Sequence, residues 1–267
     1  MKVDVCTWTR NGARSLPTVL ERVDRVVPFR RKIAVDDSSS DDTVRILKDF
    51  NYEVYCNERG FLFGGTSEAL KHVGTEFFVS VEQDVLLGFD WWNSVSRFLE
   101  DKYVAVAQGV EYSTCRAEHG IEKTVLKQIQ NMPPHLKSRL WKSIGNNVYR
   151  TSAVKQVGFV SDSVMMQSFY NRIINAGYKW ITDDTAVSTH LHGGLLGAVK
   201  HTRQFYGLTN EKTFLDSLTK LRFLAGFALS PFTGLKLAIN SREPTVPFLH
   251  IARKFALWPV FLRRRNK

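Results

Sequence analysis

The sequence predicts an α/β fold in which helices cover both faces of a mixed, mostly parallel sheet. Over the first hundred residues, short apolar runs typical of buried strands alternate with stretches that carry apolar residues at helical spacing. Acidic residues follow two of these runs, at the strand ends where open α/β sheets bind ligands. The 267 residues, 43% of them hydrophobic, suit a globular protein with a sizeable core.

Each expected element has a local reason. The run VDVCTW near the start of the chain reads as a buried strand, and Pro17 fits the first turn of the helix that follows. Gly177 is a stop signal for an amphipathic helix. We expect strands at 3–8, 32–36, 52–56, 76–84, 103–110 and 178–182, helices at 15–27, 42–50, near 65–73, 91–101 and 165–177, a helical but irregular stretch at 121–145, and a short strand followed by a helical turn within 146–159.

The segment VDDSSSDDT at residues 35–43 places four carboxylates around one turn. Asp41 or Ser40 can cap the helix that starts near residue 42, because a side-chain oxygen accepts an otherwise unpaired backbone N–H there. Acidic side chains also suit the positive end of a helix dipole. Capping leaves Asp36 and Asp37 unexplained, and their place at the carboxyl end of a strand makes them candidate ligand-binding residues.

Two further polar groups follow apolar runs. Glu82, Gln83 and Asp84 close the run FFVSV, and His190 and His192 come after TDDTAVST. Each group alone is also typical of caps, solvated loops or packed histidines. Together, carboxylates on neighbouring strand ends and a late histidine predict a site for a hard divalent cation, Mg²⁺ or Mn²⁺, with room for a phosphate.

In order and spacing these motifs resemble those of the family 2 glycosyltransferases of GT-A fold. The similarity covers roughly residues 1–195 and implies a nucleotide-sugar-binding catalytic domain at residues 1–196. Its matching elements are the turn from Thr7 to Asn11, VDDSSSDDT, EQD at 82–84, VGFVSD at 157–162, FYNRIINAGYKW at 169–180, and His190.

The resemblance also implies roles for individual residues. Asp84 binds the metal that bridges the donor diphosphate, and the metal offsets the charge on the departing nucleoside diphosphate. Glu82, His190 and His192 are the other implied metal ligands. Gly64 and Gly65 either allow close approach of the donor or belong to an ordinary loop before a helix. The implied nucleotide-sugar contacts are Thr7, Asn11, Asp36, Asp37, Gly64, Gly65, Glu82, Gln83 and Arg203.

One departure from the family pattern concerns the catalytic base. Most members carry an acidic pair six or seven residues before the arginine numbered 172 here, but this chain has Met165, Met166 and Gln167. Methionine and glutamine do not take up a proton at neutral pH. Either Asp162 serves as the base, or the acceptor is already ionised, as a polyprenyl phosphate is.

The C-terminal segment differs from the rest of the chain in charge. Residues 197–267 hold 13 Lys and Arg against three acids, so they carry +10 of the net +11. Their longest uncharged run, residues 223–235, is shorter than the roughly 20 residues that span a bilayer. Aromatic and aliphatic residues interleaved with basic ones favour helices that lie on a membrane surface. We therefore expect a basic amphipathic helical region at 197–267, after a hinge at 192–197; a helix pair packed on the catalytic domain is the alternative.

The three cysteines have no spacing typical of metal ligands, which favours a reducing, cytoplasmic compartment. The first residues have no apolar segment typical of a signal peptide. Together the features predict an inverting glycosyltransferase, of hexosyl or N-acetylhexosaminyl groups, at the cytoplasmic membrane face. Its expected partners are a nucleoside-diphosphate-sugar and a lipid-linked acceptor, either a polyprenyl phosphate or a lipid-linked saccharide.

Two alternatives stay open at this point. NGARSLPTVLE at 11–21 faintly resembles the glycine-rich turn of sugar nucleotidyltransferases, although the proline-lysine expected downstream is missing. A non-catalytic basic module that binds membrane or nucleic acid fits the charge of the C-terminal segment but leaves the paired strand-end acids unexplained. Nucleic acid ranks lower, because the apolar content of the segment exceeds what phosphate contacts need.

Overall fold

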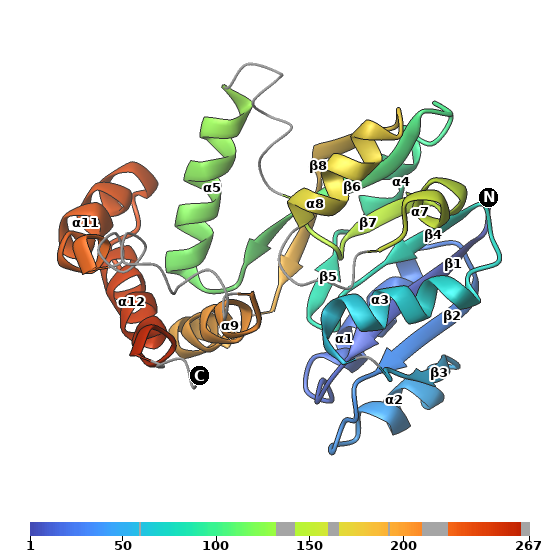
Figure 1. Ribbon diagram of the computed structural model, residues 1–267, viewed down its shortest axis with the longest axis horizontal. Helices are drawn as coiled ribbons and strands as arrows, with labels where there is room; N and C mark the ends of the chain where they lie inside the picture. Colours follow the sequence, from blue (N-terminus) through green and yellow to red (C-terminus); the bar gives the residue numbers. More distant parts are fainter. Residues whose placement is uncertain (59, 132–141, 160–165, 192, 210–223, 263–267) are drawn as a thin grey trace, which may run out of the picture. The chain divides into compact units, whose positions relative to one another are not determined.

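The computed structural model describes residues 1–58, 60–131, 142–159, 166–191, 193–209 and 224–262 (Figure 1). The contacts divide the chain into two compact units. The first unit comprises residues 1–111 and 138–191, and the second comprises residues 112–137 and 192–267. In this division, residues 112–137 group with the C-terminal segment. The predicted domain boundary between residues 196 and 197 stays a prediction.

An eight-stranded mixed sheet has the strand order β3-β2-β1-β4-β7-β6-β8-β5. The pairs β3–β2, β2–β1 and β1–β4 are parallel, whereas β7 runs antiparallel to both β4 and β6, and β5 runs antiparallel to β8. The strands are β1 (Val3–Thr9), β2 (Phe29–Asp36), β3 (Glu53–Cys56), β4 (Phe77–Ser80), β5 (Val85–Leu87), β6 (Val104–Ser113), β7 (Asn147–Arg150) and β8 (Lys179–His190).

Helices cover both faces of this sheet, which confirms the predicted fold class. Because side chains alternate along a strand, Phe77 and Val79 of β4 enter one core and Phe78 enters the other. Val19 and Val23 of α1 pack in the first core, and α3, α7 and α8 pack in the second (Figure 1). The helices of this unit are α1 (Leu16–Val26), α2 (Thr43–Asp49), α3 (Phe61–His72), α4 (Trp91–Ser96), α7 (Thr151–Val157) and α8 (Met166–Asn175).

Strand β8 is longer than the predicted 178–182. From Ala186 to His190, buried residues alternate with more exposed ones, as in an antiparallel strand with one solvated face. Polar residues beyond 182 belong to this strand because their side chains find partners. Asp183 accepts a hydrogen bond from Arg97 at 2.9 Å and another from the Thr185 hydroxyl. The extra length carries the strand as far as His190.

Other expected boundaries also differ from the structure. The apolar run at 76–84 is strand β4 followed by a turn, because the polar residues from Glu82 leave the ladder before β5 begins. Among its described residues, the stretch 121–145 is helical up to Gln130, within α5 (Arg116–Gln130), and is not helical at 142–145. Residues 132–141 lie outside the described part of the chain.

The second unit consists mainly of helices in its described residues, with the end of β6 at Tyr112 and Ser113. Its helices include α5, α9 (Gly194–Thr209), α11 (Ser230–Ser241) and α12 (Val246–Leu262). They share a small buried core that contains Cys115, Ala198, Ala238 and Leu249. The segment predicted as a hinge therefore overlaps the start of α9. Among the described helices, none is both long and apolar enough to cross a membrane.

Candidate active site

The loop after β1 is joined by hydrogen bonds to the loop after β2, and Asp36 lies at the centre of this contact. Its carboxylate accepts hydrogen bonds from the Thr9 hydroxyl at 2.9 Å, the Ser39 backbone N–H at 2.8 Å and the Ser39 hydroxyl at 2.6 Å. Asp37 is more exposed and forms an ion pair with Arg10 at 3.2 Å. Of the two adjacent acids, Asp36 therefore holds the loop together and Asp37 is accessible to a ligand.

Further contacts extend this junction toward α2. The side-chain oxygen of Asn11, whose φ is +49°, accepts a hydrogen bond from Ser40 N–H at 2.8 Å. The Gly12 N–H donates to the Thr43 hydroxyl at 2.7 Å, and Asp41 accepts the Thr43 N–H at 3.0 Å. Asp41 thus pairs with the first backbone N–H of α2, whereas the N-cap position is Asp42, whose side chain forms no capping hydrogen bond.

The two adjacent acids should differ in their effect on stability. Asp36→Ala leaves the buried partners of the carboxylate unpaired, so we expect the free energy of unfolding to fall by about 1–3 kcal/mol. Asp37→Ala removes an exposed ion pair, which contributes about 0–1 kcal/mol. Urea unfolding of both variants measures the difference. Equal losses would contradict the separation of roles between Asp36 and Asp37.

Gln83 attaches the third loop to the first. Its side-chain amide accepts the Arg10 N–H at 2.9 Å and donates to the Arg10 carbonyl at 3.2 Å. A Cβ on Gly12 would lie 2.4 Å from the Gln83 oxygen, so a side chain at this position would displace the amide from the Arg10 backbone. The predicted donor contact of Gln83 stays a prediction, but the amide already fixes the position of the EQD turn beside β1.

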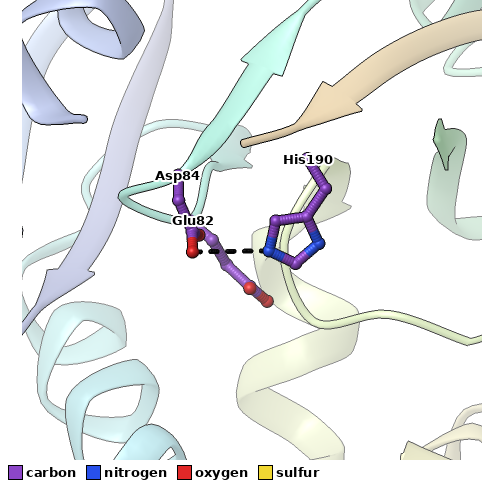
Figure 2. Close-up of side chains that lie close together, drawn as sticks. All are labelled: Glu82, Asp84 and His190. Atoms are coloured by element: carbon purple, nitrogen blue, oxygen red, sulfur yellow. Dashed lines mark ion pairs between the residues drawn. The ribbon is translucent and has the colours of Figure 1, made fainter. Parts of the chain in front are cut away.

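Glu82, Asp84 and His190 form a cluster at one edge of this unit (Figure 2). One ligand atom from each of the three lies within 4.8 Å of the other two. The sheet explains the proximity, because Val85 of β5 pairs with His190 of β8 and so places Asp84 beside the imidazole. The backbone reinforces it, since the Leu191 N–H donates to the Asp84 carbonyl at 2.8 Å.

A fourth residue of this site, Glu111, was not predicted. Its carboxylate lies 3.5 Å from Nδ1 of His190, whereas Nε2 of the same ring lies 3.4 Å from the Asp84 carboxylate. The Ser143 hydroxyl donates to Glu111 at 3.3 Å. The sequence did offer one signal for Glu111, because this acid directly follows the apolar run of β6. The expected strand, however, ended at residue 110.

The electrostatics of the cluster suit a divalent cation. Burial, together with the charges of Glu111 and Asp84, raises the pKa of Glu82 to about 8, and burial likewise raises the pKa of Glu111. Burial alone would lower the pKa of His190, but its acidic neighbours outweigh burial and raise it to about 10. Three crowded carboxylates beside one imidazole offer the oxygen and nitrogen ligands that Mn²⁺ and Mg²⁺ accept.

The structure places the other predicted residues less directly. Thr7 is buried within β1, and Gly64 lies in α3. A Cβ on Gly65 would lie 2.9 Å from Cβ of Trp8, which gives that glycine a packing role between helix and strand. Asp162 and His192 lie outside the described residues, and Arg203 is described only as backbone within α9. The donor-binding and catalytic roles assigned to these residues stay predictions.

Comparison with protein families gives one match. The family model described as glycosyl transferase family 2 matches residues 4–159, more than half of the chain. This range includes both strand-end loops, the EQD turn and Glu111. No curated protein matches the sequence significantly.

Several solved structures are similar to the chain in fold. A mannosyltransferase from Pyrobaculum calidifontis, PcManGT in complex with GDP-Man and Mn²⁺, is 16% identical with a TM-score of 0.62, covering 97% of this chain and 87% of its own. TarS 1-349 of S. aureus with UDP-GlcNAc is 16% identical with a TM-score of 0.56, covering 98% and 90%. Glucosyl-3-phosphoglycerate synthase of Mycobacterium tuberculosis with Mn²⁺, UDP and glucosyl-3-phosphoglycerate is 14% identical with a TM-score of 0.51, covering 79% and 81%.

Proposed function

The chain belongs to glycosyl transferase family 2, and on that basis we propose that it transfers a sugar from a nucleoside diphosphate to a lipid-linked acceptor at the cytoplasmic face of a membrane. One observation carries the donor side of the proposal. The accessible Asp37 and the turn that holds Glu82 and Asp84 are both joined to the loop after β1, through contacts of Arg10 with Asp37 and with Gln83, and His190 ends β8 in the same cluster. This arrangement of acids suits a nucleoside near Asp37 and a metal-bound diphosphate at the cluster.

The metal is proposed to be Mn²⁺ or Mg²⁺. Asp84, Glu82 and His190 would hold it, and when bound it would act as a Lewis acid that offsets the negative charge of the leaving diphosphate. Two of the solved relatives, PcManGT and glucosyl-3-phosphoglycerate synthase, were determined with Mn²⁺, which supports this choice. Glu111 is proposed as a positioning residue, because a carboxylate on Nδ1 orients the imidazole and leaves Nε2 for the metal.

Inversion requires a single displacement. An acceptor oxygen forms a bond to the anomeric carbon from the side opposite the diphosphate, and the bond from that carbon to the diphosphate oxygen breaks. A hydroxyl acceptor must also lose a proton, and Asp162 is the proposed base. A phosphate acceptor such as a polyprenyl phosphate has no proton to lose, which fits Met165, Met166 and Gln167 at the position of the family's acidic pair.

The proposed membrane location is supported by the surface of the second unit. Large apolar side chains are exposed on α11 and α12, on helices that also carry lysine and arginine. Such a surface suits a helix pair lying in the interface of an anionic bilayer. The exposed residues at these helices are Leu229, Phe232, Leu235, Ile239, Phe248 and Phe255.

The proposed reaction is tested by its products. The chain is incubated with Mn²⁺, a polyprenyl phosphate and, in turn, UDP-, GDP- and dTDP-sugars, and the released nucleotide is identified. We expect one donor to yield a nucleoside diphosphate together with a glycosylated lipid. Formation of pyrophosphate from a nucleoside triphosphate and a sugar phosphate would instead identify a nucleotidyltransferase.

A further inference from the structure

A cavity of about 340 Å³ lies within the second unit, between the first turns of α5 and the turn that joins α11 to α12. Its volume is within the range of small-molecule sites. Its charged and imidazole lining comes from both segments: Arg116, His119 and Lys123 from α5, and Arg242 and Glu243 from the turn. We call this cavity the basic pocket.

Close packing and hydrogen bonds build the walls of the basic pocket. A Cβ on Gly120 would lie 3.0 Å from Cβ of Glu243 and 3.1 Å from Cβ of Ser241, so glycine lets the turn approach α5 closely. Within the turn, the Thr245 hydroxyl donates a hydrogen bond to the Glu243 carboxylate at 2.6 Å. Arg242 adopts the left-handed backbone conformation, with a φ of +56°, and so reverses the chain at the end of α11.

The pocket has an excess of positive charge. Its lining holds three cations and one carboxylate, and that carboxylate, Glu243, lies 3.5 Å from Arg116. Lys123 and Arg242, both exposed, provide the remaining charge of +2. Burial and the neighbouring Lys123 lower the pKa of His119, so its ring is neutral at pH 7 and does not change the charge of the lining. The positive end of the α5 dipole adds to the attraction for an anion.

An apolar stripe lies on the exposed face of α11, the helix whose C-terminal end lines this pocket. Phe232, Leu235 and Ile239 are 72%, 56% and 69% exposed, and their spacing of three and four residues puts them on one face of the helix. Arg242 follows as the C-cap residue of the same helix. A ligand that meets both features has an anionic group for the pocket and a hydrocarbon portion for the stripe.

We propose that the basic pocket binds the phosphate group of a membrane lipid while the α11 stripe contacts its acyl region. Arginine and lysine are the usual partners of phosphate, and the combination of a basic cavity with an adjoining apolar helix face matches a phospholipid at the bilayer surface. This inference rests on the proposed membrane association and is independent of the proposed transfer reaction. It assigns the second unit a lipid site of its own.

A pair of matched double variants tests the inference in the full chain. Lys123→Gln with Arg242→Asn removes two charges from the pocket, and asparagine tolerates the left-handed backbone at 242. Lys127→Gln with Lys200→Gln removes two charges from exposed positions of the same unit, on α5 and α9, that do not line the pocket. Binding to phosphatidylcholine vesicles that contain phosphatidylglycerol is measured by co-sedimentation. Melting temperatures report folding, and the single Lys123→Gln variant replaces the double one if the latter does not fold.

We expect the pocket variant to bind the vesicles about 25-fold more weakly than the control variant, since each cation near an anionic surface contributes about fivefold and the variant removes two. Inorganic phosphate should compete with vesicle binding by the unmodified chain more than sodium chloride of equal ionic strength does. Equal losses in the two variants would overturn the pocket assignment alone. Saturable binding of inorganic phosphate with unchanged vesicle binding would overturn the lipid source. Absence of vesicle binding by the unmodified chain would overturn the membrane association as well, without bearing on sugar transfer.

Discussion

Asp84→Asn is expected to lower metal-dependent sugar transfer by about a thousandfold or more while leaving the fold intact. The asparagine side chain has nearly the same shape as aspartate, but it lacks the charge that a divalent cation needs from this ligand. Without the cation, the charge that develops on the leaving diphosphate is not offset; interactions of this kind contribute several kcal/mol to the transition state. Asp84 lies 3.4 Å from His190 in the cluster, so the change affects its centre.

The measurement is the release of nucleoside diphosphate from the donor in the presence of Mn²⁺, with circular dichroism as the check on folding. Asp90→Asn is the matched control, because Asp90 is an exposed acid six residues along the chain that is not part of the cluster. We expect the control to keep its activity. Metal-dependent turnover at the normal rate in Asp84→Asn would remove Asp84 from the metal site.

His190→Gln is expected to lower transfer by about a hundredfold, and Glu111→Gln by about ten- to a hundredfold, the range typical of residues that orient a metal ligand. Glu111 faces Nδ1 of His190 at 3.5 Å, so its effect should pass through the imidazole. The double variant should then lose little more than His190→Gln alone, because the two residues act as one unit.

The dissociation constant for Mn²⁺, measured by isothermal titration, separates positioning from a general structural role. We expect both single variants to bind Mn²⁺ more weakly, by a factor similar to their loss of activity. Losses that multiply in the double variant, or an unchanged affinity for Mn²⁺ in Glu111→Gln, would contradict the positioning role of Glu111.

Much of the candidate site was predictable because parallel strands present their carboxyl ends at one edge of the sheet. Asp36, Asp37, Glu82 and Asp84 each follow an apolar run, and this pattern was sufficient to group them. The different environments of Asp36 and Asp37 were not predictable, because they depend on which carboxylate the hydroxyl of Thr9 reaches across 27 residues of sequence. Local patterns carry no information about such a contact.

Other features depended on tertiary pairing. The bond from Gln83 to the Arg10 backbone spans 73 residues, and nothing in EQD distinguishes an amide that binds a ligand from one that binds the main chain. The helical character of the C-terminal segment was predicted from its composition. Its shared core with α5, which includes Cys115 and Leu249, joins parts of the chain more than a hundred residues apart and is not visible in either segment alone.

The most direct test of the account is the position of the metal in a crystal of the chain grown with Mn²⁺ and either UDP or GDP. Anomalous scattering at the manganese edge locates the ion without reference to the surrounding protein. We predict one strong peak within about 2.5 Å of an Asp84 carboxylate oxygen and of Nε2 of His190, on the diphosphate side of the nucleotide. A nucleotide bound in the loops after β1 and β2 with manganese elsewhere, or no manganese at this cluster, would contradict the account.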